Sequence, residues 1–282
     1  MSLSINTNQT SLFAQNQLGE IRQSQAGALR SLASGQRINS AAENPAVAAI
    51  VQQFAAQIAG SDQAARNLND GVSLTQVADG AIGQLQANSG RLRELAVAAG
   101  NGTLSAADRG ALQAEADQLV QANNDIVKQT NFNGNPLLQG GSPLGFQSGA
   151  NAGQQTSLAA ANLAAANLAA APASGGLFSL AGGIDLSSAA KASQTLGNLD
   201  TDLDTLASSR ASFGAASNAF TAEIGNLQTR ADNLAAARSR SNDTDYAAAS
   251  AQLAQQQILG QANIAVQSQA NASASQVLGL LR

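Results

Sequence analysis

Apolar side chains recur three and four residues apart over most of this chain, which is the spacing of one face of an α-helix. Near the start, the residues that keep this spacing are Leu18, Ile21, Gln25, Ala28 and Leu32. They predict a helix from about residue 5 to residue 33. Gly35 is expected to end it, because glycine readily adopts the left-handed conformation that closes many helices.

A second, longer helix is predicted from residue 45 to about residue 100. Asn44 and Pro45 mark its start, since Asn caps free N–H groups and Pro is tolerated at the first helical position. A seven-residue repeat typical of coiled coils runs through Ile82, Leu85, Ser89, Leu92, Ala96 and Ala99. This face should therefore pack against another helix.

A third helix is predicted after Asn101 and Gly102, which interrupt the pattern. Ser105 and Asp108 have the spacing of a capping box, in which each residue satisfies a free N–H group of the other, with Asp in place of the usual Glu. The apolar positions seven residues apart in this helix are Leu112, Leu119 and Ile126. The helix should end near residue 131.

The middle of the chain is irregular, because residues 134–183 are rich in Gly and hold three of the four prolines. Residues 143–149 and 154–158 are short segments separated by Gly and Asn, which predicts a small β-hairpin. The rest of this stretch is of low complexity and is expected to form an exposed insertion.

The last stretch, from about residue 188 to residue 282, contains no proline and is predicted to be helical. Its apolar positions are first Leu196, Leu199, Leu203, Leu206, Phe213 and Phe220, and then Leu259, Ala262, Val266, Ala270, Ser273, Val277 and Leu280. The two ends of the chain can pair as a two-helix coiled coil, which leaves their other apolar faces uncovered. Ends of this kind are expected to be disordered alone and to become ordered upon assembly.

The amino-acid composition excludes several classes of function. The chain has no His and no Cys, which removes imidazole acid–base chemistry, thiolate nucleophiles and nearly all transition-metal sites, so neither a cofactor nor a metal is expected. A net charge of −4, with 11% charged residues, is unsuited to a nucleic-acid partner. No stretch is long and apolar enough for membrane insertion, and the first ten residues lack the regions of a cleaved secretory signal. We therefore expect a protein that is not an enzyme.

Three polar features of the sequence could suggest a functional site, and each also has a structural explanation. Asp200, Asp202 and Asp204 alternate as in a calcium loop, but Gly and Glu are missing at the required later positions, so a solvated helix face is favoured. A second group, made of Arg238, Arg240, Asp243 and Asp245, predicts an ion-pair region near residue 242. Tyr246, the single Tyr, is expected to anchor this junction.

The residues that match a known family lie in both arms. They are INTN at 5–8, LASGQRINSAAENP at 32–45, RNLNDGVSLTQVADGA at 66–81, RLRELAVAAGNGT at 91–103, QTNFNG at 129–134, ARSRSNDTDYAAA at 237–249, QILGQA at 257–262 and VLGLLR at 277–282. With these segments in this order, the sequence resembles bacterial flagellin, the subunit of the flagellar filament. The predicted fold is mainly α: a long helical hairpin or coiled-coil rod with paired terminal helices and a small β-hairpin in a short central insertion.

The resemblance implies five segments. Residues 1–43 and 242–282 correspond to the N-terminal inner-tube helix with its spoke and to the C-terminal inner-tube helix; residues 44–140 and 188–241 to the helical rod; and residues 141–187 to the short variable insertion. It also implies export through the flagellar type III apparatus, an extracellular location in the flagellum, and a homopolymer as the final state. The implied partners are the cap and hook–filament junction proteins and an export chaperone.

Two sets of site residues follow. The terminal stripes expected to mediate self-assembly comprise Ile5, Leu12, Leu18, Ile21, Leu32, Leu259, Val266, Val277, Leu280 and Leu281. The resemblance further places Arg91, Leu95, Glu115 and Gln118 at positions that contact the Toll-like receptor for flagellin, with polar groups around Leu95. The resemblance implies that the same rod surface also makes subunit contacts in the filament. Such contacts would explain the presence of these residues without any receptor.

The predicted function is a structural subunit of the filament used for swimming. Two alternatives stay open at this point. One is a hook–filament junction protein, which shares part of the terminal resemblance. The other is a surface adhesin or carbohydrate-binding helical protein that uses the central insertion.

Overall fold

The computed structural model describes residues 7–164 and 176–280, which form two compact units. Within the described residues, one unit comprises residues 7–56 and 233–280, and the other comprises residues 57–164 and 176–232. The helices are α1 (Gln9–Ser34), α2 (Pro45–Ala99), α3 (Ala106–Gln129), α4 (Ala189–Asn242) and α5 (Tyr246–Leu280), with a 3-10 helix η2 (Phe178–Ala181). The strands are β1 (Asn131–Phe132), β2 (Asn135–Pro136), β3 (Leu144–Gln147) and β4 (Gln155–Leu158). These bounds confirm the predicted helices and the predicted hairpin.

The helix ends follow from local side-chain chemistry. The Asn8 side chain accepts a hydrogen bond from the Ser11 N–H at the start of α1, and Gly35 ends that helix with a φ of 68°. The side chain of Asn44 accepts from the Val47 N–H over 3.1 Å at the start of α2. The roles of Gly35 and Asn44 are the predicted ones, whereas the cap at Asn8 had not been predicted.

The turn between α2 and α3 is fixed from both sides. Ser105 and Asp108 form the predicted capping box at the start of α3. Arg109 donates from its guanidinium group to the carbonyl oxygens of Ala99, Asn101 and Leu104, over 3.0, 2.8 and 2.9 Å. Because the last carbonyls of a helix lack partners within it, Arg109 stabilises the end of α2.

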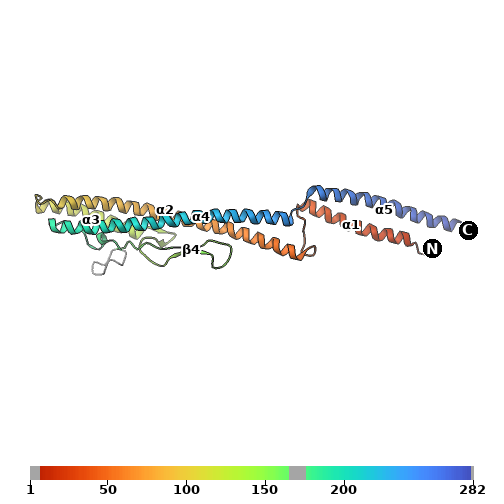
Figure 1. Ribbon diagram of the computed structural model, residues 1–282, viewed down its shortest axis with the longest axis horizontal. Coiled ribbons are helices and arrows are strands. Elements are labelled where there is room, and N and C mark those ends of the chain that lie inside the picture. The colour runs from red at the N-terminus through yellow and green to blue at the C-terminus, as the bar shows by residue number, and fades with distance from the viewer. Residues whose placement is uncertain (1–6, 165–175, 281–282) are drawn as a thin grey trace. The chain divides into compact units, whose positions relative to one another are not determined.

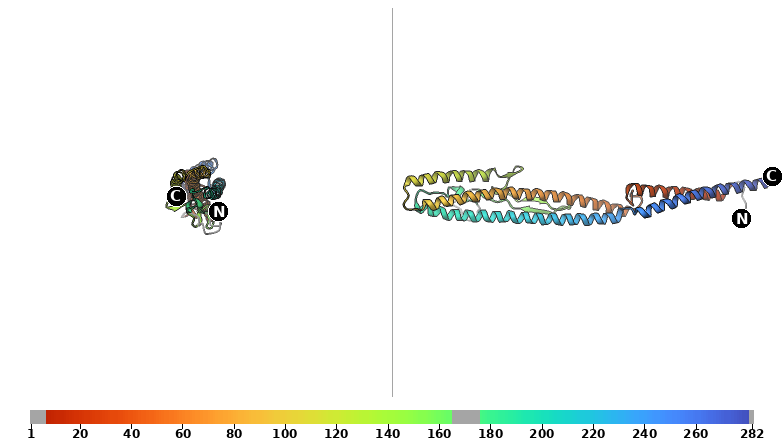
Figure 2. Two further views of the ribbon diagram at one scale, coloured as in Figure 1. Left: turned by 90° about the vertical axis from the view of Figure 1, so that its left-hand side faces the viewer. Right: turned by 90° about the horizontal axis from the view of Figure 1, so that it is seen from above.

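The unit made of residues 57–232 is a helical rod in which α2, α3 and α4 lie side by side (Figure 2). The α2 face that enters its core keeps an unbroken 3-4 repeat through Ser61, Ala64, Leu68, Gly71, Thr75, Ala78, Ile82, Leu85, Ser89, Leu92, Ala96 and Ala99. The matching α4 residues lie seven apart and are Ala192, Leu199, Leu206, Phe213, Phe220 and Leu227. The predicted coiled-coil seam of α2 is thereby confirmed.

Two ion pairs connect α2 with α4 along the rod. Arg93 Nε lies 2.8 Å from Asp200 Oδ1, and Arg210 Nε lies 2.7 Å from Asp79 Oδ1. All four side chains are about half exposed, so water screens the attraction and each pair adds little stability. The two pairs instead fix the alignment of the helices, because each joins one position on α2 to one position on α4.

The β-hairpin packs on the rod through one aromatic contact. Strands β3 and β4 pair antiparallel with Leu144 opposite Leu158, and the ring of Phe146 lies 5.3 Å from that of Phe220 at an interplanar angle of 64°. This edge-to-face geometry is favourable for aromatic pairs. The short pair of β1 and β2 had not been predicted.

The Asp-x-Asp-x-Asp segment corrects one prediction. Asp200 and Asp204 are exposed as expected, but Asp202 is 0% exposed. Its carboxylate accepts hydrogen bonds from the N–H groups of Phe178 and Ser179 over 2.7 and 2.8 Å. Asp202 is buried because it lies between Leu199 and Leu206 on the core face of α4, where it holds the start of η2.

Candidate functional site

The helices α1 and α5 form an antiparallel pair, with the start of α1 beside the far part of α5 (Figure 1). Asn8 Nδ2 donates to the Ala270 carbonyl oxygen over 2.9 Å at one end of the pair. The Tyr246 hydroxyl donates to the Leu32 carbonyl oxygen over 2.6 Å at the other end. Gly260 lies in the contact between these ends, where a Cβ would be 3.7 Å from Ile21 Cγ2. Pairing of the chain's two ends is thus confirmed.

The faces that meet in this pair are poor in large apolar side chains. On α1 the residues that line the contact are Ser11, Ala14, Leu18, Ile21, Gln25, Ala28 and Leu32. On α5 they are Ala249, Leu253, Gln256, Gly260, Asn263, Gln267 and Ala270. Both sets keep regular 3-4 spacing, but the α5 set contains one large apolar side chain, Leu253. The pairing therefore buries little apolar area.

Further large apolar side chains lie on the outer faces of both helices. Those on α1 are Leu12, Phe13 and Leu29, which are 56%, 66% and 50% exposed. Those on α5 are Ile258, Leu259, Ile264 and Val266, which are 67%, 43%, 51% and 53% exposed. Single exposed apolar residues are ordinary, whereas a concentration on one helix pair marks a surface that binds another protein surface.

The predicted stripe of α5 is not the face that pairs with α1. Leu259 and Val266 are exposed, and of the predicted stripe Ala270 enters the contact. On α1, Leu18, Ile21 and Leu32 are half-buried against α5, while Leu12 is exposed; the assembly role expected of these residues stays a prediction. Ile5 and Leu281 lie outside the described residues, as do the side chains of Val277 and Leu280.

The segment between α4 and α5 is held by backbone contacts with the end of α1. The Arg37 N–H donates to the Asn242 carbonyl oxygen over 2.6 Å, and the Thr244 N–H donates to the Gly35 carbonyl oxygen over 3.0 Å. With the Tyr246 hydroxyl bond, these contacts confirm the anchoring role expected of Tyr246. The expected ion pairs of Arg238 and Arg240 with Asp243 and Asp245 do not occur among the described residues. Asp245 instead caps α5, because it accepts from the Ala247 and Ala248 N–H groups.

The candidate receptor patch lies where α2 and α3 run together. Arg91 pairs with Glu94 and with Glu115 over 2.8 Å each, and the hydrogen bonds that it donates to these two carboxylates raise the pKa of Arg91. Gln118 is exposed on the same helix as Glu115. Leu95, expected at the centre of the patch, is 3% exposed because it packs with Leu92, Ala96 and Ala99 in the rod core. Leu95 is therefore too buried to form the centre of the patch. The exposed residues that remain are polar.

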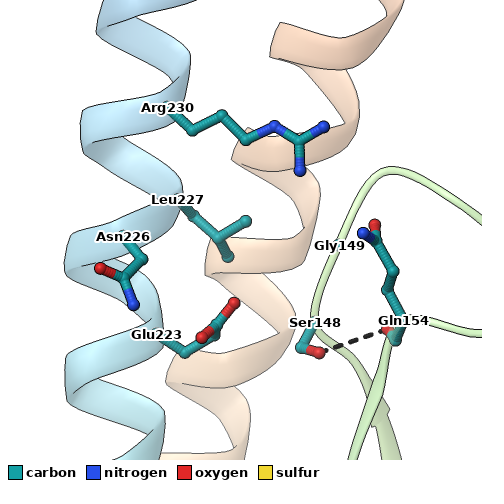
Figure 3. Close-up of a pocket in the computed structure, with 7 residues that line it drawn as sticks. All are labelled: Ser148, Gly149, Gln154, Glu223, Asn226, Leu227 and Arg230. Atoms are coloured by element: carbon teal, nitrogen blue, oxygen red, sulfur yellow. Dashed lines mark hydrogen bonds between the residues drawn. The ribbon is translucent and has the colours of Figure 1, made fainter.

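A small cleft opens between α4 and the turn that joins β3 to β4, with a volume of about 250 Å³ (Figure 3). Its lining residues are Ser148, Gly149, Gln154, Glu223, Asn226, Leu227 and Arg230. The Ser148 hydroxyl donates to the Gln154 carbonyl oxygen, so the hydroxyl serves the turn. Glu223 and Arg230 lie seven residues apart on one helix and form no ion pair with each other in the described structure. This set offers no activated nucleophile for catalysis.

Residues 7–164 and 176–280 lack two further kinds of site. None of their helices has the length and apolar character needed to cross a membrane. The same residues contain no group of three or more acidic side chains placed to hold a metal ion.

Together, the rod and the outward apolar faces define a class: a helical structural subunit that is completed by other protein surfaces. Residues 5–142 match the model of the bacterial flagellin N-terminal helical region, and residues 196–281 match that of the C-terminal helical region. The chain belongs to the bacterial flagellin family.

The relatives agree with this assignment. The chain is 32% identical over 285 residues to the flagellar filament 30.7 kDa core protein of Treponema maltophilum, covering 98% of this chain and 99% of that protein. It is 35% identical over 280 residues to a flagellin of Halalkalibacterium halodurans, covering 99% of both. The crystal structure of Bacillus cereus flagellin has 30% identity and a TM-score of 0.48, covering 61% of this chain and 94% of that one. The assignment rests on the sequence matches.

Proposed function

We propose that this chain is the repeating subunit of a bacterial flagellar filament, exported from the cell and assembled outside it. The observation that carries the proposal is the set of large apolar side chains that α1 and α5 expose on the faces turned away from each other. The matched relatives are named as flagellins and as a filament core protein, which favours a filament subunit over a junction protein or an adhesin. The family is structural, in keeping with a protein that is not an enzyme.

The energetics support assembly through these faces. Full burial of one large apolar side chain contributes about 1.5–3 kcal/mol, and among the described side chains α1 and α5 expose the seven named above. The contact between α1 and α5 within one chain buries few of them. Because helices gain most of their stability from packing, these two helices depend on neighbouring copies for their full stability. Folding of the chain's ends and polymerisation are therefore coupled.

The segments take the roles that the family implies. Residues 1–43 and 242–282 form the inner tube, with the spoke after α1; residues 44–140 and 188–241 form the surrounding rod; and residues 141–187 are the solvent-facing insertion. Ile5, Val277, Leu280 and Leu281 extend the assembly surface beyond the exposed residues described above. The cap protein, the hook–filament junction proteins and an export chaperone are the partners of this cycle.

A second role is recognition by the Toll-like receptor for flagellin. Its support is the polar patch of Arg91, Glu115 and Gln118, which is exposed on the rod surface. Arg91 is held in place by its two carboxylate partners, so the patch is pre-organised. Leu95 is excluded from direct contact by its burial.

A matched pair of variants tests self-assembly. The double variant Ile258→Ser and Val266→Ser removes two exposed apolar side chains from α5, whereas Gln257→Ser and Gln261→Ser change two exposed polar ones on the same helix. The apolar variant should raise the critical concentration for polymerisation, measured by sedimentation, by at least about tenfold. The control should shift it by less than about twofold, although Gln→Ser costs at least as much helix propensity as the apolar changes, because it removes no apolar surface. Equal behaviour of the two variants would refute this assembly surface.

A further inference from the structure

Four fully buried polar side chains lie in the rod, and each comes from a different segment of the chain. They are Ser89 of α2, Asn123 of α3, Asp202 of α4 and Ser179 of η2, and all four are 0% exposed. The mechanism of assembly proposed above uses none of them. A core of close-packed helices does not require polar groups, and burying them costs free energy unless they are hydrogen-bonded. The presence of these four side chains therefore needs a physical explanation.

All four lie where one apolar cluster of the rod gives way to the next. The first cluster includes Leu85, Val127, Leu206 and Leu180, and the second includes Leu92, Ala116, Leu199 and Ile184. Ser89, Asn123 and Asp202 each fall between the two clusters on their own helix, and Ser179 directly precedes Leu180. Val120 of α3 packs against both clusters. The polar residues therefore share one level of the rod.

Contacts between the segments support this common level. Asn88 Nδ2 donates to Asn123 Oδ1 over 2.8 Å, which joins α2 to α3 next to Ser89. Arg93 pairs with Asp200 over 2.8 Å, which joins α2 to α4 close to Asp202. The 3-10 helix η2 contacts α3, and its first N–H groups donate to Asp202.

The hydrogen-bonding capacities of the four side chains are complementary but not used up. Within the described residues, Ser89 Oγ, Asn123 Nδ2 and Ser179 Oγ have no hydrogen-bond partner. Each of these atoms carries a hydrogen to donate. The Asp202 carboxylate has about four acceptor positions, of which two receive the N–H groups of Phe178 and Ser179. The level thus holds both surplus donors and a carboxylate with surplus acceptor capacity.

The electrostatics of Asp202 fit the same picture. Burial raises the pKa of its carboxyl group, while the Ser179 hydroxyl and the N–H groups of Ser179 and Phe178 lower it. The Ser179 N–H donates to the carboxylate, while the hydroxyl of the same residue has no hydrogen-bond partner among the described residues. A buried donor left without a partner costs about 1–3 kcal/mol, and proteins commonly meet such a need with an internal water that makes about three hydrogen bonds.

We propose that Ser89, Asn123, Ser179 and Asp202 form one buried polar layer that binds internal water, which bridges the Asp202 carboxylate to the donors on α2 and α3. Water is the ligand that the layer selects, because it both donates to a carboxylate and accepts from hydroxyl and amide groups. A metal ion is disfavoured, since the layer supplies a single carboxylate.

The layer fixes how the helices align along the rod. Leucine packing alone tolerates a shift of one helix by a seven-residue repeat, because the same residue types return. A shift of α4 would move Asp202 away from the donors and leave them all unpaired among leucines. This role concerns the folded rod of one chain and does not depend on polymerisation.

A thermodynamic cycle on the full-length monomer tests whether the layer acts as a unit. Asn123→Ala should lower the midpoint of thermal unfolding by roughly 3–8 °C in the otherwise unchanged protein. In an Asp202→Ala background, the same change should have less than about half this effect, because the network is already broken. The control background is Thr75→Ala: Thr75 is buried too, but its hydroxyl donates within its own helix to Val72, so the effect of Asn123→Ala should be unchanged there. Equal effects in all three backgrounds would overturn the single layer.

Water is detected directly by nuclear magnetic resonance of the deuterated full-length monomer. Cross-relaxation from water to the Asn123 side-chain amide should have the sign of a long-lived bound molecule, and it should disappear in Asp202→Ala. A Ser89→Ala variant, which is a small change, should weaken the same signal while the rod stays folded. If the Asn123 amide shows no such cross-relaxation, or shows a direct scalar coupling to the Asp202 carboxyl carbon, the hydrated layer is wrong.

Discussion

Gly71 of α2 lies against the ring of Phe220 so closely that a methyl group does not fit between them. A Cβ at residue 71 would be 3.0 Å from Phe220 Cε2 and 3.4 Å from Phe146 Cε1. The absence of a side chain at Gly71 thus allows the hairpin and α4 to meet over α2. A glycine inside a helix otherwise costs about 0.5–1 kcal/mol relative to alanine.

Replacing Gly71 with Ala should therefore destabilise the rod, despite the better helix propensity of alanine. We expect the free energy of unfolding of the monomer to fall by about 1–3 kcal/mol, because the rings of Phe220 and Phe146 must move away from α2. Gly80 is the matched control, since it lies in the same helix with no atom within 4 Å of its Cβ position. Gly80→Ala should stabilise the monomer by up to about 1 kcal/mol in the same denaturant titration. A stabilised Gly71→Ala protein would contradict the close contact.

Tyr246→Phe should loosen the junction of α5 with the end of α1 while keeping the ring. The change removes the hydroxyl that donates to the Leu32 carbonyl oxygen over 2.6 Å. We expect local opening to become easier by about 0.5–1.5 kcal/mol, read as faster hydrogen exchange of amides near the end of α1. Ser268→Ala is the control, because the Ser268 hydroxyl bonds within α5 to Ile264. Unaltered exchange in Tyr246→Phe would show that the hydroxyl bond is dispensable.

The Asp185 carboxylate should titrate in an unusually acidic range. Hydrogen bonds from Lys191 and then Ser187 lower the pKa of Asp185 to about 2 from 3.8. Because the folded pKa is lowered, the stability from this group is fully present above pH 3.8 and is lost as the pH falls toward 2. Lys191→Ala should raise the pKa of Asp185 and so narrow the pH range over which this contribution to stability is lost. A titration that follows the carboxyl carbon resonance of Asp185 measures the change in pKa. An unchanged Asp185 titration in Lys191→Ala would contradict the assigned cause.

Arg91→Ala separates receptor recognition from folding. Purified monomer with this change should signal through the receptor at least roughly tenfold more weakly, because Arg91 lies in the exposed patch. Its ion pairs are solvent-exposed, so the midpoint of thermal unfolding should stay the same. Arg66→Ala is the control, since Arg66 is bonded to Gln63 on its own helix. Full signalling by Arg91→Ala would leave this residue with a packing role alone.

Sequence patterns predicted the rod well where the packing partner lies in the same chain. The seam of α2 was placed correctly even at Ser89 and Ala96, because an unbroken repeat marks the buried face whatever residue occupies it. The same logic would have placed Asp202 in the core, three residues after Leu199 and four before Leu206. Its charge instead suggested solvent, since an unpaired buried carboxylate is rarely stable. The N–H groups that stabilise it come from η2, a segment too short to predict.

The sequence of α5 did not show which of its faces pairs with α1. Its most apolar stripe faces outward, and the face against α1 carries Gln256, Asn263 and Gln267. A hydrophobic pattern identifies the face with the greatest apolar area but does not identify its partner. Where the partner belongs to another molecule, the stripe and the intrachain contact are separate faces, and one sequence alone does not distinguish them.

The repeat of α2 runs from Ser61 to Ala99 without a skipped position. In a straight helix such a repeat drifts around the axis by roughly 20° per heptad, which adds up to about 100° over five heptads. To stay in contact, α2 and its partners in the rod must wind around one another with a left hand. Such a rod has a torsional preference: a twist in the sense of the winding presses the core side chains together, whereas the opposite twist separates them.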